Sequence, residues 1–299
     1  MQVLVKPVGG PAPRPVRLES TALPSGSSMG RKPRKNHLTN WWAPQAVPEG
    51  QCLSAEIGPL SLSLARLAGE WDLISSQGPE SDAVEESRLR IEPCKGFDDQ
   101  TVERFVHAGT TDRVILQPVL ADRPVVIRPR QPLALLGGQK ITLYLSTPVF
   151  IRLLIGEDET VMLKELPTVK LSDTWFGPST REGEVCYAGR TQARHDLAEL
   201  PRRSHRAVTP LEVHNQSNIP LALDKISVPV PMLALFGSER AGLWTQRLVL
   251  EATGQADMAS IRIESQAPEV DGAMVRLAEP RQTSTRSGLI RAFSHLLGD

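Results

Sequence analysis

The chain has 299 residues, of which 40% are hydrophobic and 23% are charged, and these values are typical of a globular protein rather than a disordered one. Lysine and arginine together number 34, as do aspartate and glutamate, so the net charge provides no general attraction to nucleic acid or to anionic membranes. The length allows one large domain or two ordinary ones, and the 25 prolines indicate many turns between short strands.

The first 48 residues are rich in proline, glycine and serine, and they predict a disordered arm, because such a composition buries too little apolar surface to offset the entropy lost on ordering. Met29 is a second candidate for the start of the chain. The arm contains a basic cluster, Arg31, Lys32, Arg34 and Lys35. An arm that contacts nucleic acid or lipid headgroups is an alternative interpretation of this cluster, but four charges without periodicity support it weakly.

A β domain is predicted for residues 49–168. Leu60, Leu62 and Leu64 alternate with small polar residues, which is the period of a half-buried strand. Further short apolar runs follow, and proline, glycine or aspartate separates nearly every pair. Gly137 and Gly138 predict a two-residue hairpin turn between two of these runs.

Residues 169–281 predict a second β domain, a sandwich of the immunoglobulin or jelly-roll kind. Leu211 and Val213 alternate with polar residues, a polar turn follows at 215–218, and a further short run resumes at Leu221, which together resemble a hairpin. The fold class predicted for the whole chain is therefore mainly β, with two β-sandwich domains.

The tail, residues 282–299, predicts a short amphipathic helix. Its apolar residues fall on one helical stripe, and they are Leu289, Ile290, Phe293, Leu296 and Leu297. We expect this helix to close the sandwich, and a detachable helix that binds a partner groove or a membrane surface is the alternative.

Three widely spaced cysteines, Cys52, Cys94 and Cys186, form neither a disulfide framework nor a zinc motif, so we expect reduced thiols in a protein core. The N-terminus has no apolar segment followed by a cleavage site, and the most apolar run, 226–236, is too short to span a bilayer. The sequence predicts a soluble cytoplasmic protein without an integral membrane segment.

Catalytic chemistry has one candidate nucleophile, Cys186, which has Glu184, His195 and His205 nearby in the sequence. Cys186 lies in a strand-like run where a small buried thiol fits the core, so the structural interpretation is favoured. A pair of carboxylates cannot be assigned without geometry. His195, His205 and His214 lack the spacing of a metal motif, and no cofactor is predicted.

The strongest binding candidate is an arginine-rich segment together with a turn that begins at Trp175. The candidate binding residues are Arg190, Arg194, Arg202, Arg203, His205, Arg206 and Trp175. Guanidinium groups suit phosphate, carboxylate or an acidic protein face. The alternative is that these arginines pair with the acidic loop at 79–86. Nucleic acid is not predicted, because aromatic residues, on which bases stack, are only 4% of the chain.

Two runs, TWFGPSTREGEVCYAGRTQAR and HRAVTPLEVHNQSNIPLALDKISVPVPMLALF, followed by LWTQRLVLE, resemble a domain family of unknown function found in archaea and bacteria. The resemblance covers most of the chain after the arm and brings no activity, catalytic residue or cofactor. Members of the family are often encoded near small mechanosensitive channels, so the resemblance implies a cytoplasmic accessory or regulatory partner of a membrane channel.

We therefore predict a non-catalytic binding or accessory protein. The alternatives are a hydrolase with a site between the two β domains, built on Cys186 or a carboxylate pair, and a structural scaffold or oligomer. The oligomeric state is not predicted.

Overall fold

The computed structural model describes residues 40–81, 87–98, 101–129, 133–157, 160–177, 179–253, 258–270, 272–283 and 289–291. All of them belong to one compact unit, Asn36–Asp299. Residues 1–39 of the predicted arm, with its basic cluster, lie outside the described residues. The end of the predicted arm is folded, because Trp41 and Val47 are fully buried and the strand β1, Gln45–Ala46, pairs with β7.

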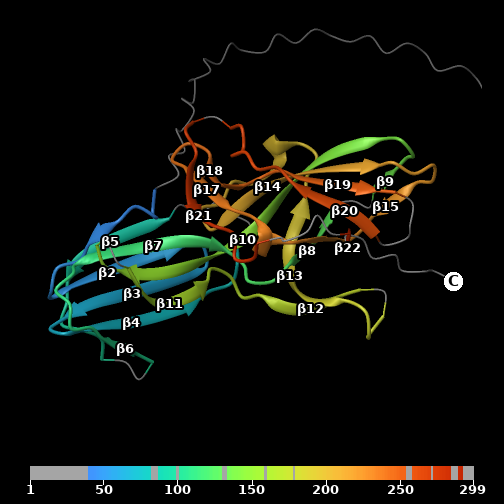
Figure 1. Cartoon of the computed structure of the whole chain (residues 1–299). Coiled ribbons are helices and arrows are strands. Elements are labelled where there is room, and N and C mark those ends of the chain that lie inside the picture. The colour runs from blue at the N-terminus through green and yellow to red at the C-terminus, as the bar shows by residue number, and fades with distance from the viewer. Residues whose placement is uncertain are drawn as a thin grey trace, which may run out of the picture. The chain divides into compact units, whose positions relative to one another are not determined.

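The prediction of a mainly β fold is confirmed (Figure 1). The residues that the structure describes form strands and two short 3-10 helices, η1 at Leu197–Glu199 and η2 at Val230–Met232, and they contain no α-helix.

A five-stranded antiparallel sheet has the order β5-β2-β3-β4-β6. Its strands are β2 (Gln51–Ile57), β3 (Leu60–Leu67), β4 (Glu70–Gln77), β5 (Arg88–Pro93) and β6 (Glu103–Val106). The alternation predicted at Leu60, Leu62 and Leu64 is confirmed, because all three side chains are buried and Ser61 between the first two is exposed.

An eleven-stranded sheet contains strands from both predicted domains. Besides β1, its strands are β7 (Arg113–Leu120), β10 (Lys140–Ile155), β11 (Val161–Pro167), β14 (Arg206–Asn215), β17 (Leu235–Ser238), β18 (Gly242–Thr245), β19 (Leu248–Ala252), β20 (Met258–Ile263), β21 (Val275–Ala278) and β22 (Leu289–Arg291). The 16-residue strand β10 pairs with β14 through its first half and with β7 through its second. One hydrophobic cluster also joins Leu64, Leu116 and Leu211. The boundary at residue 168 stays a prediction, and the arrangement as two sandwiches is not confirmed.

Two smaller sheets complete the fold. A four-stranded sheet has the order β12-β13-β8-β16 and a two-stranded sheet pairs β9 with β15. These strands are β8 (Val125–Pro129), β9 (Leu133–Leu135), β12 (Ser172–Phe176), β13 (Glu184–Ala193), β15 (Leu221–Leu223) and β16 (Ile226–Val228). Figure 1 shows β12 in yellow below β13, with which it forms a hairpin.

The hairpin predicted at Gly137–Gly138 and the one predicted after Val213 are both wrong. The predicted hairpins would pair β9 with β10 and β14 with β15. In the structure, β9 pairs with β15 and β10 pairs with β14. The buried side chain of Asn215 holds this corner, since its Nδ2 donates to the carbonyl of Leu135 at 2.8 Å and to that of Ile219 at 2.7 Å. Gly137 and Gly138 do form a turn, but which strands pair depends on this contact between distant segments.

The predicted C-terminal helix is not confirmed. Leu289–Arg291 is a strand, β22, which pairs antiparallel with β20, and the other residues of the predicted helix lie outside the described residues. The backbone of β20 supplies hydrogen-bond partners that a local helical pattern does not reveal.

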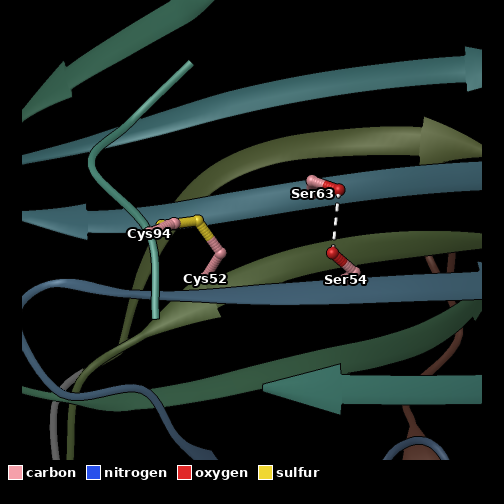
Figure 2. The surroundings of a disulfide bond; sticks show 4 residues. All are labelled: Cys52, Ser54, Ser63 and Cys94. Atoms are coloured by element: carbon pink, nitrogen blue, oxygen red, sulfur yellow. Dashed lines mark hydrogen bonds between the residues drawn. A yellow bond between two sulfur atoms is a disulfide. The ribbon is translucent and has the colours of Figure 1, made fainter. Parts of the chain in front are cut away.

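The expectation that all three cysteines are reduced is wrong. Cys52 and Cys94 form a disulfide with their Cα atoms 5.7 Å apart (Figure 2). The register of β2 against β5 places Cys52 opposite Glu92, so Cys94 lies beside it although it is 42 residues away in sequence.

Among the described residues, no helix is long and apolar enough to cross a membrane.

Candidate functional site

Three of the predicted binding residues surround one buried carboxylate. Oε1 of Glu80, in the loop after β4, lies 2.6 Å from Nη1 of Arg206, 3.0 Å from Nη1 of Arg203 and 3.3 Å from Nε2 of His205. All four side chains are largely buried, with exposed fractions of 14% for Glu80 and 5% for Arg206. We call these four residues the Glu80 cluster.

The pKa values agree with a structural role for this cluster. Burial alone would raise the pKa of Glu80, but the hydrogen bond with His205 and the charges of Arg206 and Arg203 together lower it to about 2. Burial lowers the pKa of His205, so this histidine is neutral and Nε2 carries the proton that it donates to Glu80. Its other nitrogen, Nδ1, faces Gly58, where a Cβ would lie only 2.1 Å away.

The guanidinium of Arg206 makes further contacts within the fold. Nε donates to Oγ of Ser146 at 3.0 Å, and Nη2 donates to the carbonyl of the same residue at 2.8 Å. The cluster therefore joins the loop after β4 to β10 and β14. This geometry supports the alternative that the arginines pair with the acidic loop, and their role in binding a ligand stays a prediction.

The other predicted binding residues do not join this cluster. Arg202 is exposed, and the side chain of Arg190 lies outside the described residues. The backbone of Arg194 forms an isolated bridge with Tyr144, and its Nε and Nη1 are buried without a hydrogen-bond partner in the part of the chain that the structure describes. Trp175 belongs to β12 in the four-stranded sheet. The structure thus distributes the predicted residues over several elements.

Trp175 lies on the hairpin of β12 and β13, directly opposite Val185. The two apolar side chains are 46% and 45% exposed. Nε1 of Trp175 donates to the carbonyl of Ser179 at 2.7 Å, and the hydroxyl of Ser179 accepts from the backbone N–H groups of Arg181 and Glu182 at 3.3 and 3.1 Å. The loop between the strands thus holds the indole ring in place.

Two glycines allow this loop to close tightly. A Cβ on Gly177 would lie 2.1 Å from the carbonyl oxygen of Glu182, and a Cβ on Gly183 would lie 2.5 Å from the carbonyl oxygen of Phe176 and 2.8 Å from the indole of Trp175. Such contacts are far shorter than van der Waals distances, so only glycine fits at either position without rearrangement.

The next residue pair on the same face of the hairpin is polar. Asp173 lies opposite Tyr187. Nη1 of Arg123 donates to Asp173 at 3.0 Å, and its guanidinium lies 5.4 Å from the centre of the Tyr187 ring. The Tyr187 hydroxyl donates to Asp122 at 2.8 Å, and burial together with this carboxylate raises the pKa of Tyr187 to about 12, so the hydroxyl stays protonated.

These residues form one surface, the hairpin face, defined as Arg123, Asp173, Trp175, Val185 and Tyr187. It is anchored to the core, since the Tyr187 ring lies 6.2 Å from that of the buried Phe150. Of these five residues, Trp175 alone is among the binding residues predicted from the sequence. The spacing of two residues between Val185 and Tyr187 indicates that the two side chains lie on the same face of a strand. That they lie opposite Trp175 and Asp173 depends on the register of the hairpin.

Cys186 lacks the surroundings of a nucleophile. It is fully buried, and burial and the charge of Glu184 raise its pKa to about 12, so the thiol is neutral. The closest polar atoms that its sulfur contacts are the carbonyl of Glu184 and the hydroxyl of Ser227, at 3.8 and 3.9 Å. Within the described ranges, no group of three or more histidine, cysteine, aspartate or glutamate residues is placed to hold a metal ion.

The fold and the site therefore define a mainly β protein with a half-exposed aromatic hairpin. The chain belongs to the family described as "Protein of unknown function (DUF432)", whose model matches residues 41–297. No curated protein and no solved structure matches it. The family found is one of unknown function, as the resemblance implied, and its prokaryotic distribution and its connection with channels stay predictions.

Proposed function

We propose that this protein acts by binding a protein partner, without catalysis, and that the hairpin face is its recognition surface. The observation that carries this proposal is the state of Trp175, which is half-exposed and yet fixed by its hydrogen bond to the loop. A large aromatic side chain held in one orientation loses little entropy when a partner covers it, so more of its burial is available as binding free energy.

The composition and position of the hairpin face support the same conclusion. Tryptophan, tyrosine and arginine are the residues most enriched among those that dominate binding energy at protein interfaces. Here Trp175 and Val185 supply the apolar centre, and Arg123, Asp173 and Tyr187 supply a polar border. In addition, β12 pairs only with β13 among the described strands, so its outer edge offers backbone groups to an extended segment of a partner.

The hydrolase alternative has less support. A nucleophilic thiol must be accessible and close to a base, whereas Cys186 is buried and its pKa is raised. Asp122 and Asp173, the carboxylates beside Tyr187, are engaged by Tyr187 and Arg123. A scaffold or oligomer remains compatible with the hairpin face if the partner is a second copy of this chain.

The compartment and the identity of the partner are narrower proposals. We propose a cytoplasmic protein, as the sequence predicts. The disulfide is an observation against this location, because persistent disulfides are rare in the cytosol of mesophiles. The resemblance described above makes a small mechanosensitive channel the first partner to test.

The proposal is tested by photo-crosslinking in the native cell. A benzophenone amino acid replaces Val185 in the hairpin face and, as a control, Val106, which is 87% exposed on β6. We expect a discrete adduct with one protein from position 185 alone, and we expect Trp175→Ala to abolish it. Equal adducts from both positions, or an adduct that survives this substitution, would reject the hairpin face as the recognition surface.

A further inference from the structure

The disulfide between Cys52 and Cys94 closes one end of an edge strand. Figure 2 shows it between the start of β2 and the segment that follows β5. The backbone N–H of Cys94 also donates to the carbonyl of Gly50 at 2.9 Å. Beyond these two links, β5 is attached to the five-stranded sheet by its ladder with β2.

Strand β5 itself is weakly packed. Only Leu89 and Ile91 are partly buried against the core, and the other four residues of the strand are exposed. Its ion pair, between Arg88 and Glu56 at 3.6 Å, joins side chains that are 70% and 61% exposed, and such pairs contribute little to stability in water. The covalent link therefore supplements the ladder with β2 and the two partly buried side chains in holding this strand.

The neighbouring strand in the sheet, β2, is packed more tightly than β5. Leu53, Ala55 and Ile57 of β2 are buried, and β2 also pairs along its length with β3. Loss of β5 would leave β2 as the edge of the sheet, with unpaired backbone groups. Edges of this kind pair readily with other chains.

We propose that the Cys52–Cys94 disulfide is a redox modification site whose reduction by a dithiol releases β5. Cys94 is partly exposed and Cys52 is 6% exposed, so the incoming thiolate attacks the sulfur of Cys94. A mixed disulfide with Cys94 forms, and Cys52 leaves as a thiolate and takes up a proton. The second thiol of the dithiol then releases Cys94, so that two electrons and two protons pass to the protein and the dithiol becomes a disulfide.

The chain offers internal controls for this proposal. Cys186, the third cysteine, is buried and remote in sequence, so a Cys186→Ser background confines thiol chemistry to the proposed pair. The hairpin of β3 and β4 belongs to the same sheet but has no disulfide, and it reports whether any effect is local.

The test is hydrogen exchange, followed by mass spectrometry, of the Cys186→Ser protein before and after treatment with dithiothreitol. We expect amides of residues 88–94 to exchange at least about tenfold faster after reduction, while those of residues 60–77 stay protected. The double variant Cys52→Ser/Cys94→Ser should match the reduced protein. Equal protection of β5 in both states, equal acceleration in both segments, or alkylation of both cysteines without a reductant would each overturn the proposal.

Discussion

Two arginine–carboxylate groups, the Glu80 cluster and the Arg123–Asp173 pair, differ in how far their side chains are exposed to solvent. In the Glu80 cluster, Arg206 and Glu80 are 5% and 14% exposed, whereas Arg123 and Asp173 of the hairpin face are 42% and 63% exposed. Removing ions from water costs free energy, which only close partners of opposite charge offset. The charged groups of the buried cluster are therefore occupied by their contacts with one another. The exposed pair keeps its hydration and can exchange it for contacts with a partner. Burial, rather than residue type, therefore separates the arginines of the Glu80 cluster from Arg123.

The largest expected effect is that of Arg206→Met. The substitution leaves the buried Glu80 with one cation fewer and should lower the free energy of unfolding by about 3–5 kcal/mol. Urea unfolding followed by circular dichroism measures this change. The control, Arg202→Met, alters an exposed arginine of the same segment and should change stability by less than about 0.5 kcal/mol. Similar results for the two variants would contradict the division between buried and exposed arginines.

Acid should weaken the buried cluster next. The pKa of Glu80 in the folded protein, about 2, lies below its ordinary value of 4.5, so its stabilising contribution is complete above pH 4.5 and is lost as the pH falls towards 2. The loss amounts to about 3 kcal/mol. His205 acts in the same direction from pH 6.5 downwards, because its lowered pKa means that the unfolded chain binds the proton first.

Urea midpoints measured from neutral pH to about pH 3 follow this loss. In the variant Glu80→Gln, the part of the slope below pH 4.5 should become shallower, since the titrating carboxylate is gone. A wild-type protein whose stability does not change between pH 6.5 and 3 would show that the cluster is not coupled to folding.

A smaller effect is expected from Gly183→Ala, which tests whether the loop holds the hairpin face ready for binding. The added Cβ would meet the backbone of Phe176 and the indole of Trp175, so the loop must shift and partner affinity should fall by about 1 kcal/mol, or roughly fivefold. Gly78→Ala is the control, because the nearest atom to its Cβ lies 3.7 Å away. Isothermal titration with the crosslinked partner, once purified, compares the two variants, and equal affinities would count against a fixed Trp175.

The smallest effect concerns Cys186. Its buried thiol, with a pKa raised to about 12, should react with iodoacetamide no faster than the protein unfolds. Mass spectrometry after timed alkylation of the native protein checks this. Rapid labelling of Cys186 would revive the hydrolase alternative.

Local patterns allowed part of this structure to be predicted. The alternation at Leu60, Leu62 and Leu64 predicted a strand, because the pattern of apolar and polar residues that it requires is contained in adjacent positions of the sequence. Where the outcome depended only on nearby residues, the sequence was sufficient.

The rest depends on contacts between distant segments. Arg206 and Glu80 are 126 residues apart, so the same arginines fitted either a binding loop or an internal cluster. The disulfide requires the register of β2 against β5, which brings Cys94 beside Cys52. The tail shows a further limit, since Leu289–Arg291 pairs with β20 although its apolar spacing also suits a helix.

The most direct test of the central claim is the affinity of the crosslinked partner for two variants, measured by titration. Trp175→Ala removes the centre of the hairpin face, and Arg202→Ser removes the exposed arginine beside the Glu80 cluster. We predict that the first weakens binding by about 30-fold or more and that the second leaves it unchanged. Unchanged affinity for Trp175→Ala together with a large loss for Arg202→Ser would place recognition on the arginine-rich segment and contradict our account.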